Sequence, residues 1–264
     1  MLKILAVLLG LALSLYLVVC ALLYMAQEKL LFFPNKLPAD YRFSFPEPFE
    51  ERWVTVADGT RLHGLLFRTT APKGLVFYLH GNGGALDAWG SVAPVYTRLG
   101  YDVFLLDYRG YGKSEGRIST QEQLLNDAEA AYRHLLTEYP ENKVVVLGYS
   151  LGTGVAAWLA ARHQPRLLVL QAPYYSMQDV AAYHYPWVPS QLVRYPLRTH
   201  EVLSRVAAPV VVFHGDQDEV VYYGSSLKLK PLLKPQDQLI TLRGAGHNGM
   251  TENPVYQLAL AKFL

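Results

Sequence analysis

The sequence Gly-Tyr-Ser-Leu-Gly at residues 148–152 decides the fold of this chain. Residues 143–147, which precede it, are mostly β-branched and apolar and predict a short strand buried on both faces. Residues 153–162, which follow it, are rich in Ala and Leu and predict a helix. A serine between two glycines at such a tight strand-to-helix turn is typical of a nucleophile elbow. The Ser150 hydroxyl would then stand at the positive end of the helix.

The same glycines allow two other interpretations. Residues 152–157, Gly-Thr-Gly-Val-Ala-Ala, also fit the dinucleotide-binding pattern G-x-G-x-x-A, which requires an acidic residue at the end of the next strand. The next apolar run, residues 167–170, is followed by Gln-Ala-Pro, so the dinucleotide pattern is incomplete. The second alternative is a glycine-rich turn without chemistry, and only the rest of the chain can decide against it.

The composition indicates a globular protein with no nucleic-acid-binding surface. The chain has 264 residues, of which 51% are hydrophobic, so its length allows one or two domains with a substantial core. The net charge is only +2, and basic residues form no run. The single cysteine, Cys20, cannot form an internal disulfide.

The N-terminus is long and apolar. Residues 4–26 are almost uninterrupted Leu, Val, Ala and Ile. At about 1.5 Å per residue, a helix of this length can cross a hydrocarbon core of about 30 Å. We therefore predict a single membrane anchor at residues 1–28. The alternative is a cleaved secretory signal, but the small-residue cleavage pattern is poor around Cys20.

Charges at the two ends of the apolar segment give an expected orientation. Lys3 and the N-terminal amine flank one end, whereas Glu28 and Lys29 cancel at the other. This bias keeps the N-terminus in the cytoplasm and places the folded domain on the non-cytoplasmic side.

The remaining chain predicts a linker followed by an α/β domain. Residues 29–50 are rich in proline and aromatic residues and predict a linker, whose rings contact the membrane or cover the domain's own core. Around Asp58-Gly59, two alternating segments predict a hairpin. Further strands are expected at 75–79, 103–106, 143–147, 167–170, 210–213 and 238–242, and helices at 85–99, 120–138, 153–162, 225–233 and 255–264.

The alternation of strands and helices over residues 51–264 predicts a mostly parallel sheet with helices on both faces. The opening hairpin would form its antiparallel edge. In such sheets ligands bind at the carboxyl ends of the strands.

A serine nucleophile needs a base and an acid that orients the base. On this kind of sheet they follow in the order Ser, Asp or Glu, then His. His247 lies in a glycine-rich turn after the last predicted strand and follows the late carboxylates. Asp216, Asp218 and Glu219 follow the end of a strand, and the residues alone do not separate Asp216 from Asp218.

Acyl transfer also requires donors for the developing oxyanion. The amide of Leu151, directly after the nucleophile, is one candidate, and Asn82, in the glycine-rich loop at 80–84, is the other. We interpret His80 in that loop as structural. Residues 112–114, Gly-Lys-Ser, end like a phosphate loop, but Asp107 stands where that motif needs glycine, so no nucleotide site is expected.

These motifs together resemble the α/β-hydrolase superfamily from about Trp53 to the C-terminus. The resemblance rests on five segments in the usual order: 80–82 (HGN), 107–116 (DYRGYGKSEG), 148–152 (GYSLG), 214–218 (HGDQD) and 244–248 (GAGHN). The sequence is most similar to the Bem46-like, serine aminopeptidase-like (S33-type) branch. Members of that branch often have an N-terminal membrane segment followed by a motif like Leu-Leu-Phe-Phe-Pro at residues 30–34.

The resemblance assigns roles that the residues alone leave open. It implies Asp218 as the acid, with Asp216 only a neighbour, Ser150 as nucleophile and His247 as base. It also implies Asn82 and Leu151 as oxyanion donors. No motif is broken, so an active enzyme is expected. Arg109 receives no catalytic role, and an ion pair that stabilises its loop is its expected function.

The family usually has a cap where this chain has residues 173–208, and here that segment is short and aromatic. We expect a small lid over an apolar acyl pocket, with Tyr149, Tyr174, Tyr175 and Trp187 contacting the substrate. The alternative is that these rings only pack the lid onto the sheet.

The predicted function is a membrane-anchored serine hydrolase that cleaves an ester or thioester of a small-molecule or lipid-like acyl substrate. It would need no metal or cofactor and would bind neither nucleotide nor nucleic acid. A serine peptidase and a non-catalytic binding protein on the same scaffold are the alternatives.

Overall fold

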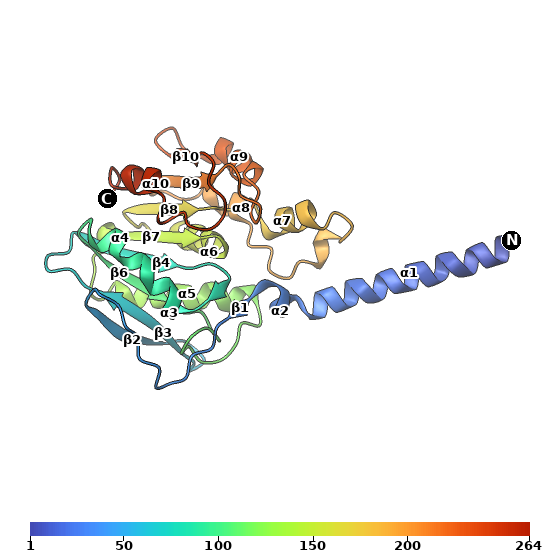
Figure 1. The fold of residues 1–264 in the computed structure, drawn as a ribbon, viewed down its shortest axis with the longest axis horizontal. Helices are drawn as coiled ribbons and strands as arrows, with labels where there is room; N and C mark the ends of the chain where they lie inside the picture. Colours follow the sequence, from blue (N-terminus) through green and yellow to red (C-terminus); the bar gives the residue numbers. More distant parts are fainter.

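An eight-stranded sheet forms the centre of the protein, which the computed structural model describes over residues 1–264 (Figure 1). The strands lie in the order β10-β9-β8-β7-β4-β6-β3-β2. Their bounds are β2 Phe49–Thr55, β3 Arg61–Phe67, β4 Gly74–Leu79, β6 Tyr101–Leu106, β7 Val144–Tyr149, β8 Leu167–Gln171, β9 Val210–Gly215 and β10 Gln238–Leu242. All neighbours from β10 to β6 pair in parallel, whereas β3 pairs antiparallel with both β6 and β2. The predicted sheet and its antiparallel edge are therefore confirmed.

The central strands are buried along their whole length. Every residue of β4, β6, β7, β8 and β9 is buried, as the continuous apolar runs in the sequence predicted. The chain crosses from β4 to β6 on one side of β4, and then from β6 back to β7 on the other side of β4. Such a point of reversal opens a crevice at the carboxyl ends of the strands. The loop after β4 and the turn after β7 meet there.

Helices cover both faces of the sheet. One face carries α3 Leu86–Trp89, α4 Ala93–Thr97 and α10 Pro254–Leu260. The other carries α5 Gln121–Leu135, α6 Leu151–Ala160, α8 Thr199–Leu203 and α9 Gly224–Leu229. Two hydrophobic clusters fill the spaces between these layers.

The predicted continuous helix at 85–99 is wrong. The segment instead forms α3, a 3-10 turn (η1, Gly90–Val92) and α4. Pro94 lies in the first turn of α4 and has no N–H to continue a preceding helix. Gly90 packs so closely against the Phe45 ring that a Cβ atom there would overlap it. The break lets the segment follow the surface of the sheet.

Most of the segment 173–208 forms a small cap, which contains α7 Met177–His184 and the 3-10 turn η3 (Ser190–Leu192). The last helix of the segment, α8, instead covers the face of the sheet that carries α6. Helix α7 begins after Ser176, whose hydroxyl accepts a hydrogen bond of 3.0 Å from the Asp179 amide. In the ribbon view α7 and its loop lie between the sheet and the base of the N-terminal helix (Figure 1).

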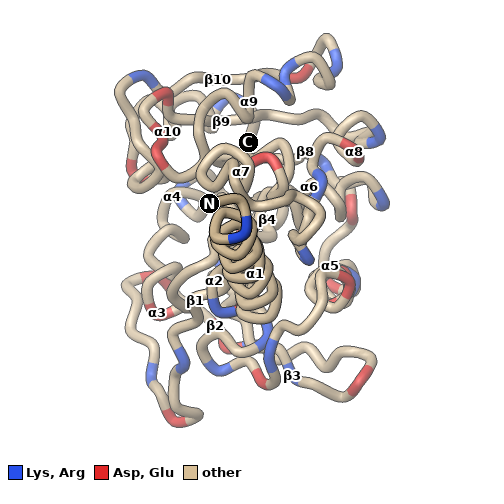
Figure 2. The backbone as a smooth tube through the Cα atoms, turned by 90° about the vertical axis from the view of Figure 1, so that its right-hand side faces the viewer, with Lys and Arg blue, Asp and Glu red and all other residues tan.

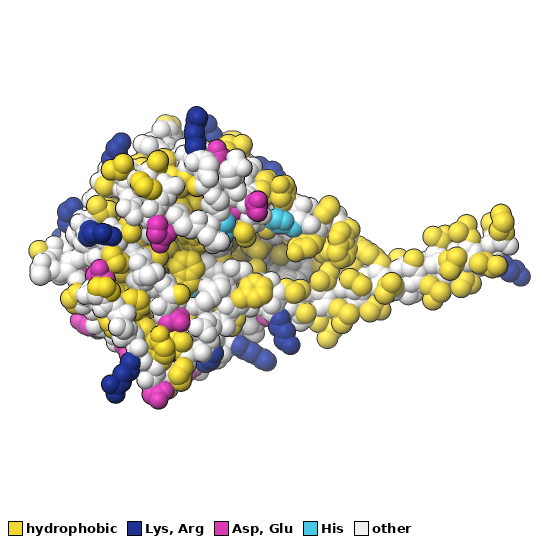
Figure 3. All heavy atoms as spheres, in the orientation of Figure 1, with side chains coloured by type: hydrophobic (Ala, Val, Ile, Leu, Met, Phe, Trp, Pro, Cys, Tyr) yellow, Lys and Arg dark blue, Asp and Glu magenta, His cyan; other side chains and the backbone are white.

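The N-terminal helix α1, Leu2–Met25, projects from the domain (Figure 1). It is the one helix long and apolar enough to cross a membrane. Its side chains are almost all exposed, and only Cys20 is buried. The space-filling view shows hydrophobic side chains along α1 that continue onto the domain where the helix meets it (Figure 3).

The segment predicted as a linker, 29–50, is folded onto the domain. The short helix α2, Gln27–Leu31, follows α1, and strand β1, Phe33–Pro34, pairs in parallel with β5, Gly83–Gly84. Phe32 is buried, and Phe43 and Phe45 pack against the core. These rings therefore cover the domain, which was one of the two expected outcomes, whereas Phe33 remains 54% exposed.

Hydrogen bonds join the N-terminal helices to the cap. The Tyr16 hydroxyl of α1 donates to the Trp187 carbonyl at 3.0 Å. In α2, the Gln27 amide group donates to the Leu192 carbonyl at 2.9 Å, and Glu28 pairs with Arg194 at 2.8 Å. The cap and the start of the chain thus form one structural unit.

Candidate active site

Ser150 lies in a strained turn between β7 and α6. Its backbone has φ 50° and ψ −116°, a conformation that non-glycine residues rarely adopt. A Cβ atom at Gly148 would overlap the carbonyl of Gly152, and one at Gly152 would overlap the carbonyl of Leu79. The two glycines flanking the serine are therefore required by close backbone packing, which explains the sequence pattern.

Three side chains from distant segments form one hydrogen-bonded row. His247 Nε2 lies 3.0 Å from Ser150 Oγ, and His247 Nδ1 lies 2.7 Å from Asp218 Oδ2. Ser150 follows β7, Asp218 follows β9, and His247 follows β10. The serine is 7% exposed and the aspartate side chain is fully buried. This geometry allows the imidazole to take a proton from the hydroxyl while the carboxylate orients it.

The Asp218 carboxylate is held by several donors. The amides of Val220 and Val221 donate to its Oδ1 at 2.9 and 2.8 Å, and His214 Nε2 lies 3.2 Å from its Oδ2. Burial alone would raise the pKa of Asp218, but the hydrogen bonds from His214, His247 and the Val221 amide outweigh burial and hold this pKa below its usual value. The carboxyl group therefore stays ionised.

Asp216 is separated from the row, although it stands only two residues earlier. Its Oδ1 accepts a hydrogen bond of 2.7 Å from the Gly244 amide. It joins the turn after β9 to the turn after β10, which carries His247. The position of Asp218 against His247 thus agrees with the role that the family resemblance implied.

Tyr149 holds the loop that carries His247. Its hydroxyl donates to the His247 carbonyl, and its ring lies against Trp89, with centroids 5.3 Å apart. Burial, together with the charges of Asp218 and Glu252, raises the pKa of Tyr149, so its hydroxyl stays protonated and remains a donor. Sequence reasoning expected Tyr149 to contact substrate and missed this supporting position.

Asn82 and Leu151 lie beside Ser150 and line the same pocket. Leu151 is the first residue of α6, where backbone N–H groups have no partner within the helix. The Asn82 side chain donates to the Leu31 carbonyl at 3.1 Å, and the backbone carbonyl of Asn82 accepts from the Phe33 amide at 2.8 Å. These two bonds hold the loop that carries Asn82 against the N-terminal segment. No motif in the sequence predicted this contact.

His80 and Arg109 are buried structural residues. His80 Nδ1 lies 2.7 Å from the Gly81 carbonyl, and its ring lies 4.4 Å from that of Tyr108. Arg109 pairs with Asp127 and, at 2.7 Å, with Asp58. The ion pair expected for Arg109 is therefore present.

An apolar pocket of about 330 Å³ opens beside Ser150. Most of its lining is hydrophobic: Leu30, Leu31, Asn82, Ser150, Leu151, Tyr174, Met177, Val180, His184, Tyr185, Val220 and Val221. The cap helix α7 forms one wall and α2 another. The contribution of α2 was not predicted.

The four aromatic residues expected to contact substrate do not share one environment. Tyr174 lines the pocket and is buried, and its hydroxyl donates to the Leu151 carbonyl at 2.8 Å. Tyr175 instead stacks on His200, with centroids 4.0 Å apart. Trp187 is 52% exposed at the tip of the cap, and Tyr149 lies behind the histidine loop. The latter three do not line this pocket.

No group of three or more His, Cys, Asp or Glu side chains is arranged to hold a metal ion. Buried Asp107 lies 3.6 Å from His80 and 3.9 Å from His63, outside hydrogen-bonding distance of either ring. The chemistry that this site can perform with its own side chains is nucleophilic attack by the serine hydroxyl, assisted by a histidine base.

Solved structures share this architecture. The Pyrococcus furiosus esterase Pf2001 superposes with a TM-score of 0.72 over 89% of this chain and 97% of its own, at 19% identity. Est1E from Butyrivibrio proteoclasticus, solved with ferulic acid bound, gives 0.68 over 80% of this chain and 97% of its own, at 21% identity. The protein thus has the α/β-hydrolase fold.

Sequence comparisons give the family. A family model described as serine aminopeptidase, S33, matches residues 70–198. An uncharacterised protein of Mycobacterium tuberculosis (strain ATCC 25618 / H37Rv) is 34% identical over 90% of this chain and 87% of its own length. Alpha/beta hydrolase domain-containing protein 17C of Mus musculus is 30% identical over 86% of this chain and 71% of its own. The chain belongs to the α/β-hydrolase superfamily, in its Bem46-like, serine aminopeptidase-like (S33-type) branch.

Proposed function

We propose that this hydrolase is a membrane-anchored serine esterase or thioesterase that works through an acyl-enzyme. The observation that carries the proposal is the row of hydrogen bonds from Ser150 through His247 to Asp218, at 3.0 and 2.7 Å. A hydroxyl, an imidazole and a buried carboxylate in this order are the parts that acyl transfer requires.

In the proposed reaction, Ser150 Oγ attacks the substrate carbonyl carbon while His247 Nε2 takes its proton. The amides of Asn82 and Leu151 donate to the oxyanion of the tetrahedral intermediate. His247 returns the proton to the departing alcohol or thiol, which leaves the acyl group on Ser150. A water molecule, deprotonated by the same imidazole, then attacks the acyl carbon. His247 returns that proton to Ser150 Oγ as the bond to the acyl group breaks and the acid is released. Throughout, Asp218 accepts from Nδ1 and stabilises the imidazolium.

The pocket favours an apolar acyl group over a peptide amine. An aminopeptidase needs a negative group for the substrate ammonium, and no Asp or Glu lines the pocket beside Ser150. Its volume of about 330 Å³ is at the lower end of the range for small-molecule sites. These features support esters or thioesters with short to medium acyl chains as substrates.

Labelling by a fluorophosphonate tests the nucleophile. The wild type and a control variant at an exposed serine, Ser91→Ala, should both be labelled, whereas Ser150→Ala should not. Absence of labelling in the wild type, or equal labelling of Ser150→Ala, would favour a non-catalytic binding protein instead.

A substrate series tests the pocket. p-Nitrophenyl esters of increasing acyl length should show a rise in kcat/KM beyond acetyl, and aminoacyl p-nitroanilides should be poor substrates. A preference for acetyl over every longer chain would reject an acyl pocket, and efficient cleavage of the anilides would favour the peptidase.

We also propose that α1 anchors the protein in a membrane. Its 24 residues, at about 1.5 Å each, exceed a hydrocarbon core of about 30 Å, and its apolar side chains are exposed. Retention of the N-terminus in the mature protein, and extraction from membranes only by detergent, are the expected results. A mature chain that starts after residue 26 would identify α1 as a cleaved signal.

The side of the membrane is tested separately. The balance of charges at the ends of α1 supports a domain on the non-cytoplasmic side. A C-terminal alkaline phosphatase fusion should then be active, whereas an active cytoplasmic reporter at the same position would reverse the orientation.

A further inference from the structure

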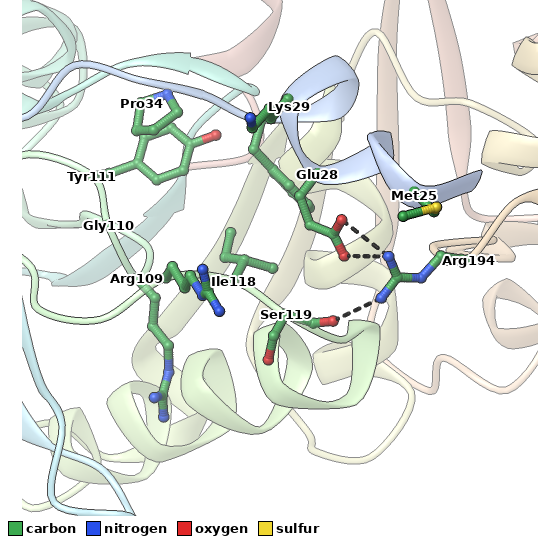
Figure 4. Close-up of a pocket in the computed structure, with 12 residues that line it drawn as sticks. Met25, Glu28, Lys29, Pro34, Arg109, Gly110, Tyr111, Ile118, Ser119 and Arg194 are labelled. Carbon is green, nitrogen blue, oxygen red and sulfur yellow. Dashed lines mark hydrogen bonds and ion pairs between the residues drawn. The ribbon is translucent and has the colours of Figure 1, made fainter. Parts of the chain in front are cut away.

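A second pocket, of about 520 Å³, lies where α1 joins the domain (Figure 4). We infer that it binds the phosphate-bearing headgroup of an anionic membrane lipid. Glu28, Lys29 and Phe32 of the α2 region line this pocket, whereas Leu30 and Leu31 line the pocket at Ser150. The two sites therefore use different faces of α2. The inference depends on the anchoring of α1, but not on hydrolysis.

The position of the pocket along α1 matches the depth of lipid phosphates. Met25, the last residue of α1, is part of the lining. From Leu2 to Met25 the helix rises by about 35 Å at about 1.5 Å per residue, and a hydrocarbon core is about 30 Å thick. With Leu2 at one edge of the core, Met25 lies just beyond the other, among the headgroups.

The pocket carries positive charge that the protein does not neutralise. Four cations line it, Lys29, Arg109, Arg117 and Arg194, with Glu28 as the single carboxylate. Arg109 is bound to Asp58 and Asp127. Arg194 is bound to Glu28 and to the Ser119 carbonyl (Figure 4).

Lys29 and Arg117 take part in no ion pair of the chain, so two positive charges remain free. They come from separate elements, since Lys29 belongs to α2 and Arg117 to the loop before α5. In the view along α1, basic residues flank α1 and α2 where they meet the domain (Figure 2). Two cations that line one cavity can both bind a phosphate in it, because each can donate charge-assisted hydrogen bonds to the phosphate oxygens.

The remaining lining favours a lipid over free phosphate. Met25, Phe32, Pro34 and Ile118 supply an apolar surface, and Phe32 and Ile118 are buried. This surface can cover the glycerol and the first carbons of the acyl chains, while Lys29 and Arg117 bind the phosphate. Basic pockets at the membrane surface recognise anionic headgroups in this way.

Calorimetric titration of the detergent-solubilised full chain tests the inference. The protein carries Ser150→Ala, so that no lipid ester is cleaved during the measurement. The ligands are dioctanoyl phosphatidylglycerol, dioctanoyl phosphatidylcholine and inorganic phosphate. We expect saturable binding of the phosphatidylglycerol that weakens as salt is added, and no saturable binding of the phosphatidylcholine.

Charge-reversal variants locate the site. Lys29→Glu with Arg117→Glu should weaken phosphatidylglycerol binding by at least about tenfold. The matched control, Lys230→Glu with Lys262→Glu, changes the net charge equally at exposed positions outside the pocket and should bind like the parent.

Three results would overturn the inference. They are equal binding of both lipids, unchanged binding by the Lys29 and Arg117 double variant, and binding of inorganic phosphate without binding of phosphatidylglycerol. The last result would assign the pocket to a soluble phosphate. Fluorophosphonate labelling of the double variant with Ser150 restored reports on the hydrolase independently, so failure of one proposal is distinguishable from failure of the other.

Discussion

Leu31 and Ser150 line the same apolar pocket, although Leu31 lies in the short helix that directly follows the apolar N-terminal helix. The start of the chain is therefore part of the candidate active site. The Asn82 side chain, which donates to the Leu31 carbonyl at 3.1 Å, strengthens this connection.

The Leu31→Ala variant should weaken use of longer acyl chains. Loss of its apolar contact is worth about 1 kcal/mol, or roughly fivefold in kcat/KM for an octanoyl ester. The acetyl ester should be affected less, because its short chain does not reach as much of the pocket wall. Steady-state kinetics on both esters provide the measurement. Leu258→Ala, at a position 72% exposed on α10, is the control and should change neither. Equal losses on both esters would argue against an acyl contact.

His214 should act as a positioning residue for Asp218. Its Nδ1 lies 2.6 Å from Ser226 Oγ, and its Nε2 lies 3.2 Å from the Asp218 carboxylate. We expect His214→Gln to lower kcat with little change in KM. The same variant should lose about 1–3 kcal/mol of unfolding free energy, because buried partners are left unpaired.

The control for His214 is Ser226→Ala, which removes the partner of Nδ1 and leaves the contacts of Nε2 with the Asp218 carboxylate and the Val221 carbonyl. It should retain most of kcat. An unchanged kcat in a folded His214→Gln protein would show that the imidazole has only a packing role.

Asp218→Asn should be nearly inactive and should also change the dependence of stability on pH. Loss of the orienting carboxylate in other serine hydrolases lowers kcat by about 10⁴. In the wild type, a pKa below the ordinary value of about 4 adds stability that is complete above that value and is lost as pH falls through the lower folded-state pKa. The wild type should therefore exceed the variant in unfolding free energy more at pH 6 than at pH 3.

Urea denaturation at pH 6, 4.5 and 3 measures this difference. If the gap between wild type and Asp218→Asn stays constant across the series, the carboxylate is not stabilised by its hydrogen bonds in the folded protein.

Gly154 and Tyr174 should be energetically coupled. A Cβ atom at Gly154 would overlap the Tyr174 hydroxyl, which accepts a hydrogen bond of 3.2 Å from the Gly154 amide. Gly154→Ala should cost about 1–3 kcal/mol through overpacking, and Tyr174→Phe about 1 kcal/mol for each hydrogen bond lost. The double variant should lose less unfolding free energy than the two single variants together, because removal of the Tyr174 hydroxyl leaves room for the Cβ atom that Gly154→Ala adds. Thermal or urea unfolding of the wild type, the two single variants and the double variant gives a double-mutant cycle. Losses of unfolding free energy that simply add would contradict the contact.

The sequence predicts the sheet and the triad geometry because both depend on local signals. Buried parallel strands such as β7 are continuous apolar runs, and the residues at their carboxyl ends meet at one edge of the sheet. The order of the strands and of the motifs that follow them was enough to predict that Ser150 and His247 lie close together. The choice between Asp216 and Asp218 needed the family resemblance, because the direction of each side chain depends on the turn that contains both.

The wall formed by α2 could not be predicted, because it depends on contacts between segments far apart in the chain. Residues 29–50 show no regular period, so nothing local indicates that Leu31 packs near Ser150. The place of Tyr149 behind the loop of His247 is likewise a tertiary contact. From the sequence alone, an aromatic residue next to the serine predicts a substrate contact as well as it predicts a contact with the loop of His247.

The pairing of Phe33 with Gly83 and of Pro34 with Gly84 affects how the domain is held. A flexible tether would let the domain swing freely relative to α1. Here the chain leaves α1, turns once through α2 and is immediately hydrogen-bonded to the loop that carries Asn82. With α1 embedded in a bilayer, as proposed, the mouth of the pocket would be held at a fixed distance from the membrane and at a fixed tilt. Molecules in the membrane at that depth would then reach Ser150 more readily than molecules dissolved in bulk water.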